Sequence, residues 1–177
     1  MDTLEELKYP IGKVKFPETI TNNHIYNWVK TIEEFPFQVE NELKSIQPNE
    51  LLFAYRPEGW NIKQLVNHCV DSLMNSIIRF KLALPEDCPI IKPYEEANWA
   101  ELSDTNSYNV SESLQLLKSL HQRWVFLLKS MSEEDFKKCF IHPDGKEIIT
   151  LEKNLCIYEW HCNHHLQHIK NAKKFQY

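Results

Sequence analysis

Four long segments of the chain repeat apolar residues at the three- and four-residue spacing of an amphipathic helix, and this pattern limits the fold most strongly. The segments span about 22–45, 62–84, 111–131 and 151–174. Only three of the 177 residues are glycine, which argues against a fold rich in strands and turns. We therefore expect an all-α protein, a four-helix bundle, with residues 1–177 forming a single domain.

Proline and glycine positions predict what lies between these helices. Two prolines and a glycine within residues 1–20 predict an extended N-terminal arm rather than a helix. Pro36 should kink or split the first long helix. Residues 85–110 contain three prolines and form a long connection of the kind that often carries function. The Asp144-Gly145 pair predicts a small β-hairpin over 138–149, directly before the last helix.

Composition argues against two classes of partner. The net charge of −5 carries no basic patch, so nucleic acid is not an expected partner. The apolar run at 124–128 is too short to cross a membrane, and the N-terminus lacks the pattern of a signal peptide. The five cysteines are scattered without a C-x-x-C motif. We therefore expect reduced thiols in a cytoplasmic protein.

Half of the eight histidines fall within residues 161–168, on the last predicted helix. His161 and His165 are four residues apart and share a helix face, as do His164 and His168. Either pair could bind a metal ion such as Zn, Ni, Cu or Fe. On a helical wheel, His165 and then His161 lie nearest the apolar side, and His164 lies farthest from it. The wheel therefore favours the pair His161 and His165.

A catalytic metal site of this kind needs a third protein ligand and an open coordination position. The candidates are the four remaining histidines, His24, His68, His121 and His142. His68 is preferred because it lies on the second predicted helix, in a strip of short polar side chains. The strip continues through Ser72, Asn75 and Arg79 and could line a polar cavity or form a solvated face. The four-residue spacing of His161 and His165 would also arise from two unrelated histidines, one buried and one exposed to water.

Longer strings of residues resemble the DinB/YfiT-like metalloenzymes, and within them the YfiT group of metal-dependent hydrolases, which is related to bacillithiol S-transferases of the BstA type. The resemblance covers essentially the whole chain. One histidine followed by an H-x-x-x-H motif is a weakly specific pattern, whereas the longer strings are much more specific. These strings include Arg56-Pro57-Glu58-Gly59-Trp60, residues 79–84 and Trp160-His161 with His164-His165.

The resemblance implies that His68, His161 and His165 together bind one divalent metal ion per subunit, either Zn or Ni. It also implies that the bundle is a mirror variant of the up-and-down topology. The family members are cytoplasmic homodimers, so a second copy of the chain is an expected partner, together with a small-molecule substrate.

Three functions are compatible with such a site. Neutral imidazole ligands leave the ion its +2 charge, so the site could activate water for hydrolysis. It could also activate a low-molecular-weight thiol for transfer to an electrophile. A non-catalytic, metal-binding stress-response protein is the third reading, and a fourth protein ligand, such as His164 or His168, would support it.

Helical spacing suggests further site residues, although no general base is evident. Asn75 and Arg79 are candidate contacts for an anionic part of the thiol or substrate. Tyr158 lies one helical turn before His161 and is a candidate hydrogen-bond donor. The chain has no His-Glu-x-x-His arrangement that would supply a base beside the metal.

Overall fold

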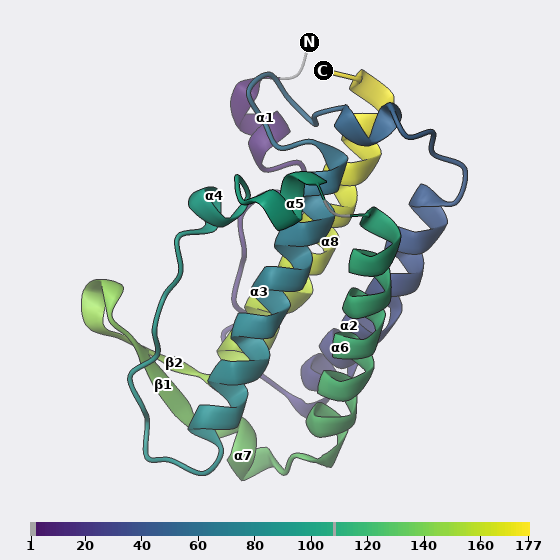
Figure 1. The fold of residues 1–177 in the computed structure, drawn as a ribbon. Helices are drawn as coiled ribbons and strands as arrows, with labels where there is room; N and C mark the ends of the chain where they lie inside the picture. Colours follow the sequence, from purple (N-terminus) through teal and green to yellow (C-terminus); the bar gives the residue numbers. More distant parts are fainter. Residues whose placement is uncertain (1–2, 108) are drawn as a thin grey trace.

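The computed structural model describes residues 3–107 and 109–177 and has the predicted four-helix bundle (Figure 1). The bundle helices are α2 (Asn22–Leu43), α3 (Ile62–Ala83), α6 (Val110–Ser130) and α8 (Leu151–Phe175). Each begins after a polar residue whose side chain accepts a backbone N–H of the first turn. These capping residues are Thr21, Asn61, Asn109 and Thr150.

The order of the helices around the bundle brings α3 beside α8. Helix α2 packs against α6 and α8, and helix α3 also packs against α6 and α8. Helices α2 and α3, which follow each other in sequence, therefore lie diagonally across the bundle, as do α6 and α8. Diagonal helices need long connections, and residues 44–61 and 131–150 provide them. The two helices that carry the predicted metal ligands are thus neighbours.

Aromatic rings join three of the helices in the core. Trp124 of α6 is fully buried, and its ring meets those of Phe80 and Tyr158 edge to face, each at a centroid distance of 5.3 Å. Such contacts add to the free energy gained by burying apolar area. Among the described residues, no helix has the length and apolar character needed to cross a membrane.

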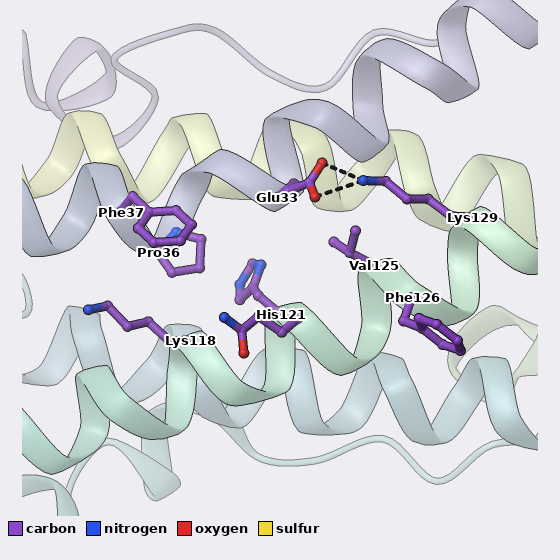
Figure 2. A pocket seen from close by; sticks show the side chains of 9 residues that line it. Glu33, Pro36, Phe37, Lys118, His121, Val125, Phe126 and Lys129 are labelled. Carbon is purple, nitrogen blue, oxygen red and sulfur yellow. Dashed lines mark hydrogen bonds and ion pairs between the residues drawn. The ribbon is translucent and has the colours of Figure 1, made fainter.

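Helix α2 continues through Pro36, so it is not split there. Proline has no N–H, and the carbonyl of Ile32 therefore loses its usual helical donor. The Nδ1 atom of His121 lies 2.8 Å from this carbonyl oxygen. Because a carbonyl only accepts hydrogen bonds, His121 carries a proton on Nδ1 and replaces the missing donor. Figure 2 shows His121 beside Pro36, in a groove that the Glu33–Lys129 ion pair spans.

The prediction of an extended arm is wrong for part of the N-terminus. Helix α1 (Leu4–Lys8) forms there, because Thr3 and Glu6 make a reciprocal capping box that stabilises even a short helix. Residues 9–21 then run without helix or strand along the bundle to α2, as predicted (Figure 1). This N-terminal segment covers part of α8.

The connections between the bundle helices contain short elements. The predicted hairpin is present, and strands β1 (Cys139–His142) and β2 (Glu147–Thr150) pair antiparallel. The short helices are α4 (Glu96–Trp99), α5 (Ser103–Ser107) and α7 (Glu133–Lys137), and the two 3-10 turns are η1 (Glu50–Leu52) and η2 (Asp144–Lys146).

The expectation that all five cysteines are reduced is wrong. Cys88 and Cys139 form a disulfide between the connection after α3 and strand β1. Ile90 and Ile141 form a β-bridge beside them, which brings the two cysteine Cα atoms to 4.8 Å. A separation of 51 residues hides this pairing in the sequence. The cytoplasmic location was inferred partly from reduced thiols, and it stays a prediction.

Candidate metal centre

Three imidazoles converge between α3 and α8. His68, His161 and His165 each offer one ring nitrogen, and these three atoms lie within 4.8 Å of one another. The Nε2 atoms of His68 and His161 are 3.1 Å apart. Two nitrogen ligands on a tetrahedral zinc ion are separated by about 3.3 Å, given Zn–N bonds of about 2.0 Å. The nitrogen donors therefore fit a divalent metal ion.

The electrostatics of the three histidines favour metal binding. Burial lowers the pKa of His68 to about 4, with a smaller contribution from His164. Burial also holds the pKa values of His161 and His165 well below their usual range, and the neighbouring imidazoles lower them further. Near neutral pH all three rings are uncharged, which is the form that donates a lone pair to a metal.

The other two histidines of the cluster are buried by the N-terminal segment. His164 and His168 are only 6% and 2% exposed, so the wheel was wrong to place His164 on the outside. The ring of Tyr9 lies 6.0 Å from that of His164, and the ring of Trp160 stacks on that of His164 at a centroid distance of 4.3 Å. A helical wheel considers one helix against the bundle core, so it cannot show a segment that covers the opposite side.

A chain of hydrogen bonds connects α1 to His165. The Nε2 atom of His168 lies 3.1 Å from the carbonyl oxygen of Lys8, which can only accept, so this nitrogen carries the proton. Neutral His168 then accepts at Nδ1, which lies 3.4 Å from Nδ1 of His165. His165 therefore carries its proton on Nδ1, and its Nε2 lone pair is left for an ion. Such bonds hold a ligand ring in one orientation.

A second group of histidines overlaps the first. The ring nitrogens of His164, His165 and His168 also lie within 4.8 Å of one another, and His165 belongs to both groups. His168, however, already uses both ring nitrogens in the hydrogen bonds to Lys8 and His165. The group of His68, His161 and His165 is therefore the better candidate for the metal site.

The other histidines considered as third ligand lie elsewhere. His24 follows the capping residue of α2, and its ring stacks on Trp28 at 5.6 Å. His121 bonds to Ile32, as described above. His142, in β1, lines the same cavity as the three imidazoles but lies outside their cluster.

The three imidazoles line a cavity of about 660 Å³. Its walls come from α3, α8, the N-terminal segment, the connections after α2 and α3, and the hairpin of β1 and β2. The aromatic lining residues are Tyr9, Tyr55, Trp60, Tyr94, Tyr158 and Trp160. The site is thus part of a pocket that a small molecule could enter, with apolar walls and several inward polar groups.

The suggested polar residues have different positions. Arg79 and Tyr158 line the cavity, whereas Asn75 is not among the lining residues and donates to the carbonyl of Asp71 at 2.8 Å. The Tyr158 hydroxyl donates to the carbonyl oxygen of Ser72 at 2.6 Å. Since its only proton is used there, the Ser72 hydroxyl donates to Tyr158 across the 3.0 Å that separate them.

Tyr94 and Glu96 are among the lining residues that were not identified from the sequence. Both belong to the connection after α3, whose length indicated function but not which side chains turn inward. Glu96 is the one carboxylate among the described residues that line the cavity. Burial raises its pKa, and the nearby Arg79 partly opposes this effect.

Comparison with known proteins identifies the family. The family profile described as the DinB superfamily matches residues 33–169. The chain belongs to the DinB superfamily. It is 44% identical over 172 residues to "Putative metal-dependent hydrolase YfiT" of Bacillus subtilis, covering 97% of each chain. A Bacillus cereus protein also named as a metal-dependent hydrolase is 44% identical over 171 residues, covering 97% of this chain and 98% of that protein.

A solved structure in this superfamily has the same fold. It is that of YfiT from Bacillus subtilis, described as a probable metal-dependent hydrolase with an unusual four-helix bundle topology. The two structures match with a TM-score of 0.93 at 43% identity, covering 96% of this chain and 97% of the other. The resemblance to DinB/YfiT-like proteins and the four-helix bundle are therefore confirmed.

Proposed function

We propose that this DinB-superfamily chain is a metal-dependent hydrolase-like enzyme with one Zn or Ni ion bound by His68, His161 and His165. The observation that carries this proposal is the convergence of three neutral imidazoles on a cavity rather than in a sealed core. The names of the YfiT relatives support the same class of reaction. An ion with three neutral ligands would lower the pKa of a bound water or thiol.

The side chains around the three histidines would prepare the reaction in three ways. Trp60, whose ring centroid lies 4.7 Å from that of His68, would exclude water from one side of the site. His168 would hold His165 in the tautomer that binds the ion. Glu96 would accept a proton, since it is the carboxylate available among the described lining residues.

A thiol S-transferase is the second candidate. Hydrolysis needs a base for the proton of water, and Glu96 is the one carboxylate among the described residues of the cavity that could serve. A thiol ionises much more readily than water, so its transfer to an electrophile needs less help from a base. The small number of carboxylates in the cavity therefore favours a low-molecular-weight thiol as an alternative substrate.

A purely structural metal site is less well supported. Such a site would need a fourth protein ligand, and His168 is occupied by its bonds to Lys8 and His165. His164 belongs to the other histidine group and not to that of His68 and His161. The three-ligand arrangement leaves a position for water or substrate.

Two parallel panels test the enzyme proposal with metal-loaded protein, chelated protein and the His161→Ala variant. One panel contains esters and amides, and the other combines low-molecular-weight thiols with a general electrophile. We expect product from one panel with the metal-loaded protein and a loss of at least roughly 100-fold in the other two samples. Equal rates in all three samples would show that the reaction does not depend on this site.

We also propose that two copies of the chain form a homodimer through the face made by α2 and α6. Tyr26, Phe37 and Phe126 on these helices are 68%, 55% and 80% exposed. Exposed apolar groups beside charged residues, such as the Glu33–Lys129 pair, are typical of protein interfaces. The face does not include the metal cavity, so both sites would remain open.

Light scattering should give twice the 21.1 kDa mass of one chain, and Phe126→Glu should give the monomer mass.

A further inference from the structure

One end of the metal cavity contains a cationic side chain without a partner. The Nε atom of Arg79 is buried and makes no hydrogen bond to any described residue. The aromatic ring associated with its guanidinium is that of Phe140, at 6.0 Å. Arginine keeps its charge and has five N–H donors, so leaving it unpaired in a partly buried position is unfavourable. A ligand that accepts these hydrogen bonds would remove the penalty.

A second unpartnered donor lies in the same cavity. The hydroxyl of Tyr94 is buried and makes no direct hydrogen bond to the described residues, although the hydroxyl of Ser72 is close enough to lower its pKa. Nearby polar groups of the lining have partners: Asn154 donates to Ser76 at 2.9 Å, and Tyr158 bonds to Ser72. Apart from Nδ1 of His164, in the histidine cluster, the unsatisfied buried polar atoms of the described lining thus belong to Arg79 and Tyr94, which come from different elements of the fold.

The other arginine of the cavity lacks this property. The Nε atom of Arg56 lies 3.2 Å from the hydroxyl oxygen of Tyr55, and one of its terminal nitrogens donates to the carbonyl of Pro57 at 2.8 Å. Its donors are thus partly used within the protein. Arg79 is the guanidinium that remains available to a ligand, and Arg56 provides a matched control for its charge.

We infer that Arg79 and Tyr94 form a subsite for an anionic group of the substrate, a carboxylate or a phosphate. This inference rests on the proposed function, because it places the reacting group of the same molecule at His68, His161 and His165. The planar fork of a guanidinium matches two oxygens of either anion, and the Tyr94 hydroxyl adds a third donor.

The spacing of His68 and Arg79 on α3 bears on the length of the substrate. His68 and Arg79 are eleven residues apart, which corresponds to about 16 Å along the helix axis. Ser72 lies between them and also lines the cavity. The guanidinium lies closer to the histidines than this backbone separation, because long helical side chains lean toward the helix N-terminus and the charge of Arg79 acts on Tyr158, whose ring is 5.5 Å from that of His161. The length of the best thiol therefore measures the distance between the two ends.

The charge of Glu96 affects how tightly the subsite binds an anion. Its carboxylate lines the same cavity and is near enough for Arg79 to lower its pKa, but the two side chains form no ion pair within the described residues. Glu96 therefore leaves the guanidinium hydrogen-bond donors free, while its own charge opposes an incoming anion. We expect Glu96→Gln to strengthen anion binding, whereas Arg79→Gln should weaken it.

The test is a calorimetric titration of the zinc-loaded full chain with three series of thiols of graded length. The series are ω-mercaptocarboxylates, ω-mercaptoalkyl phosphates and uncharged ω-mercaptoalcohols. For the best length, one anionic series should bind at least roughly tenfold more tightly than the alcohols, because the charged hydrogen bonds are partly shielded from water. The better anion identifies the class of substrate.

Variants connect this preference to Arg79. Arg79→Gln should bind anions and alcohols equally, and Arg79→Lys should recover only part of the preference because it lacks the fork. Arg56→Gln should keep the full preference. Equal binding of anions and alcohols by the native protein would overturn the subsite, as would a preference that persists in Arg79→Gln.

A final arm separates this inference from the proposed function. Alkanoates and alkyl phosphates without a thiol are titrated into the metal-free protein, where only the anionic group can direct binding. Binding that disappears in Arg79→Gln supports the subsite even if no metal-dependent reaction is found. If thiols bind through the metal but no anion effect exists, the subsite is wrong and the metal-dependent function stands.

Discussion

The His161→Ala variant should lose stoichiometric metal binding. His161 supplies a nitrogen 3.1 Å from that of His68, and its removal leaves two ligands from different helices to hold the ion. Removing the partners of metal ligands typically lowers metal affinity by roughly 10–100-fold, so direct loss of a ligand should exceed roughly 100-fold. Equilibrium dialysis followed by elemental analysis measures the ion that remains bound to native and variant protein.

Two other histidines make this measurement specific. His24→Ala removes a histidine at the start of α2, and we expect native affinity. His168→Gln leaves all three ligands but disturbs the bonds that orient His165, so its affinity should fall by roughly 10–100-fold. If His161→Ala binds one ion as tightly as native protein does, the overlapping group of His164, His165 and His168 is the metal site instead.

Metal-free protein should lose stability as the pH falls from about 6.5 to about 4. Burial lowers the pKa of His121 from 6.5 to about 4, despite its hydrogen bond to Ile32. Within this window the unfolded state binds a proton that the folded state does not, so the free energy of unfolding decreases on acidification. For His121 the full loss is about 3 kcal/mol. Urea denaturation at a series of pH values measures it.

Two replacements of His121 separate titration from hydrogen bonding. His121→Gln can still donate to the Ile32 carbonyl but cannot titrate, so it should lose less stability in acid than native protein. His121→Leu leaves that carbonyl unpaired and should cost about 1–3 kcal/mol at neutral pH as well. The buried histidines of the metal site act in the same direction, so part of the acid effect will remain. Equal acid losses in native protein and His121→Gln would exclude His121 as a source.

The regular parts of the molecule could be predicted from the sequence. Helical periodicity and polar capping residues are local signals, and they define the four long helices to within a few residues. The metal ligand candidates also follow from local spacing, because His161 and His165 lie on one face of α8. His68 was preferred as their partner because of the polar strip around it, but three other histidines stayed open until the resemblance to the family implied the same residue.

The parts that were missed depend on contacts between distant segments. The N-terminal segment covers His164 and His168 through Tyr9 and through the carbonyl of Lys8 at the end of α1. No pattern within α8 shows this contact. The Cys88–Cys139 disulfide likewise depends on a loop lying beside a strand. Tyr94 and Glu96 face the cavity from an irregular connection, where side-chain direction has no periodicity to reveal it.

The diagonal placement of successive helices would determine when the chain can bind the proposed ion. His68 and His161 are 93 residues apart in sequence and meet only after α8 has docked against α3. The two histidines on α8 alone make an incomplete site, so a partly folded chain would compete poorly for scarce metal. Ion capture would thus report the completion of folding, and the bound ion would slow the separation of α3 from α8.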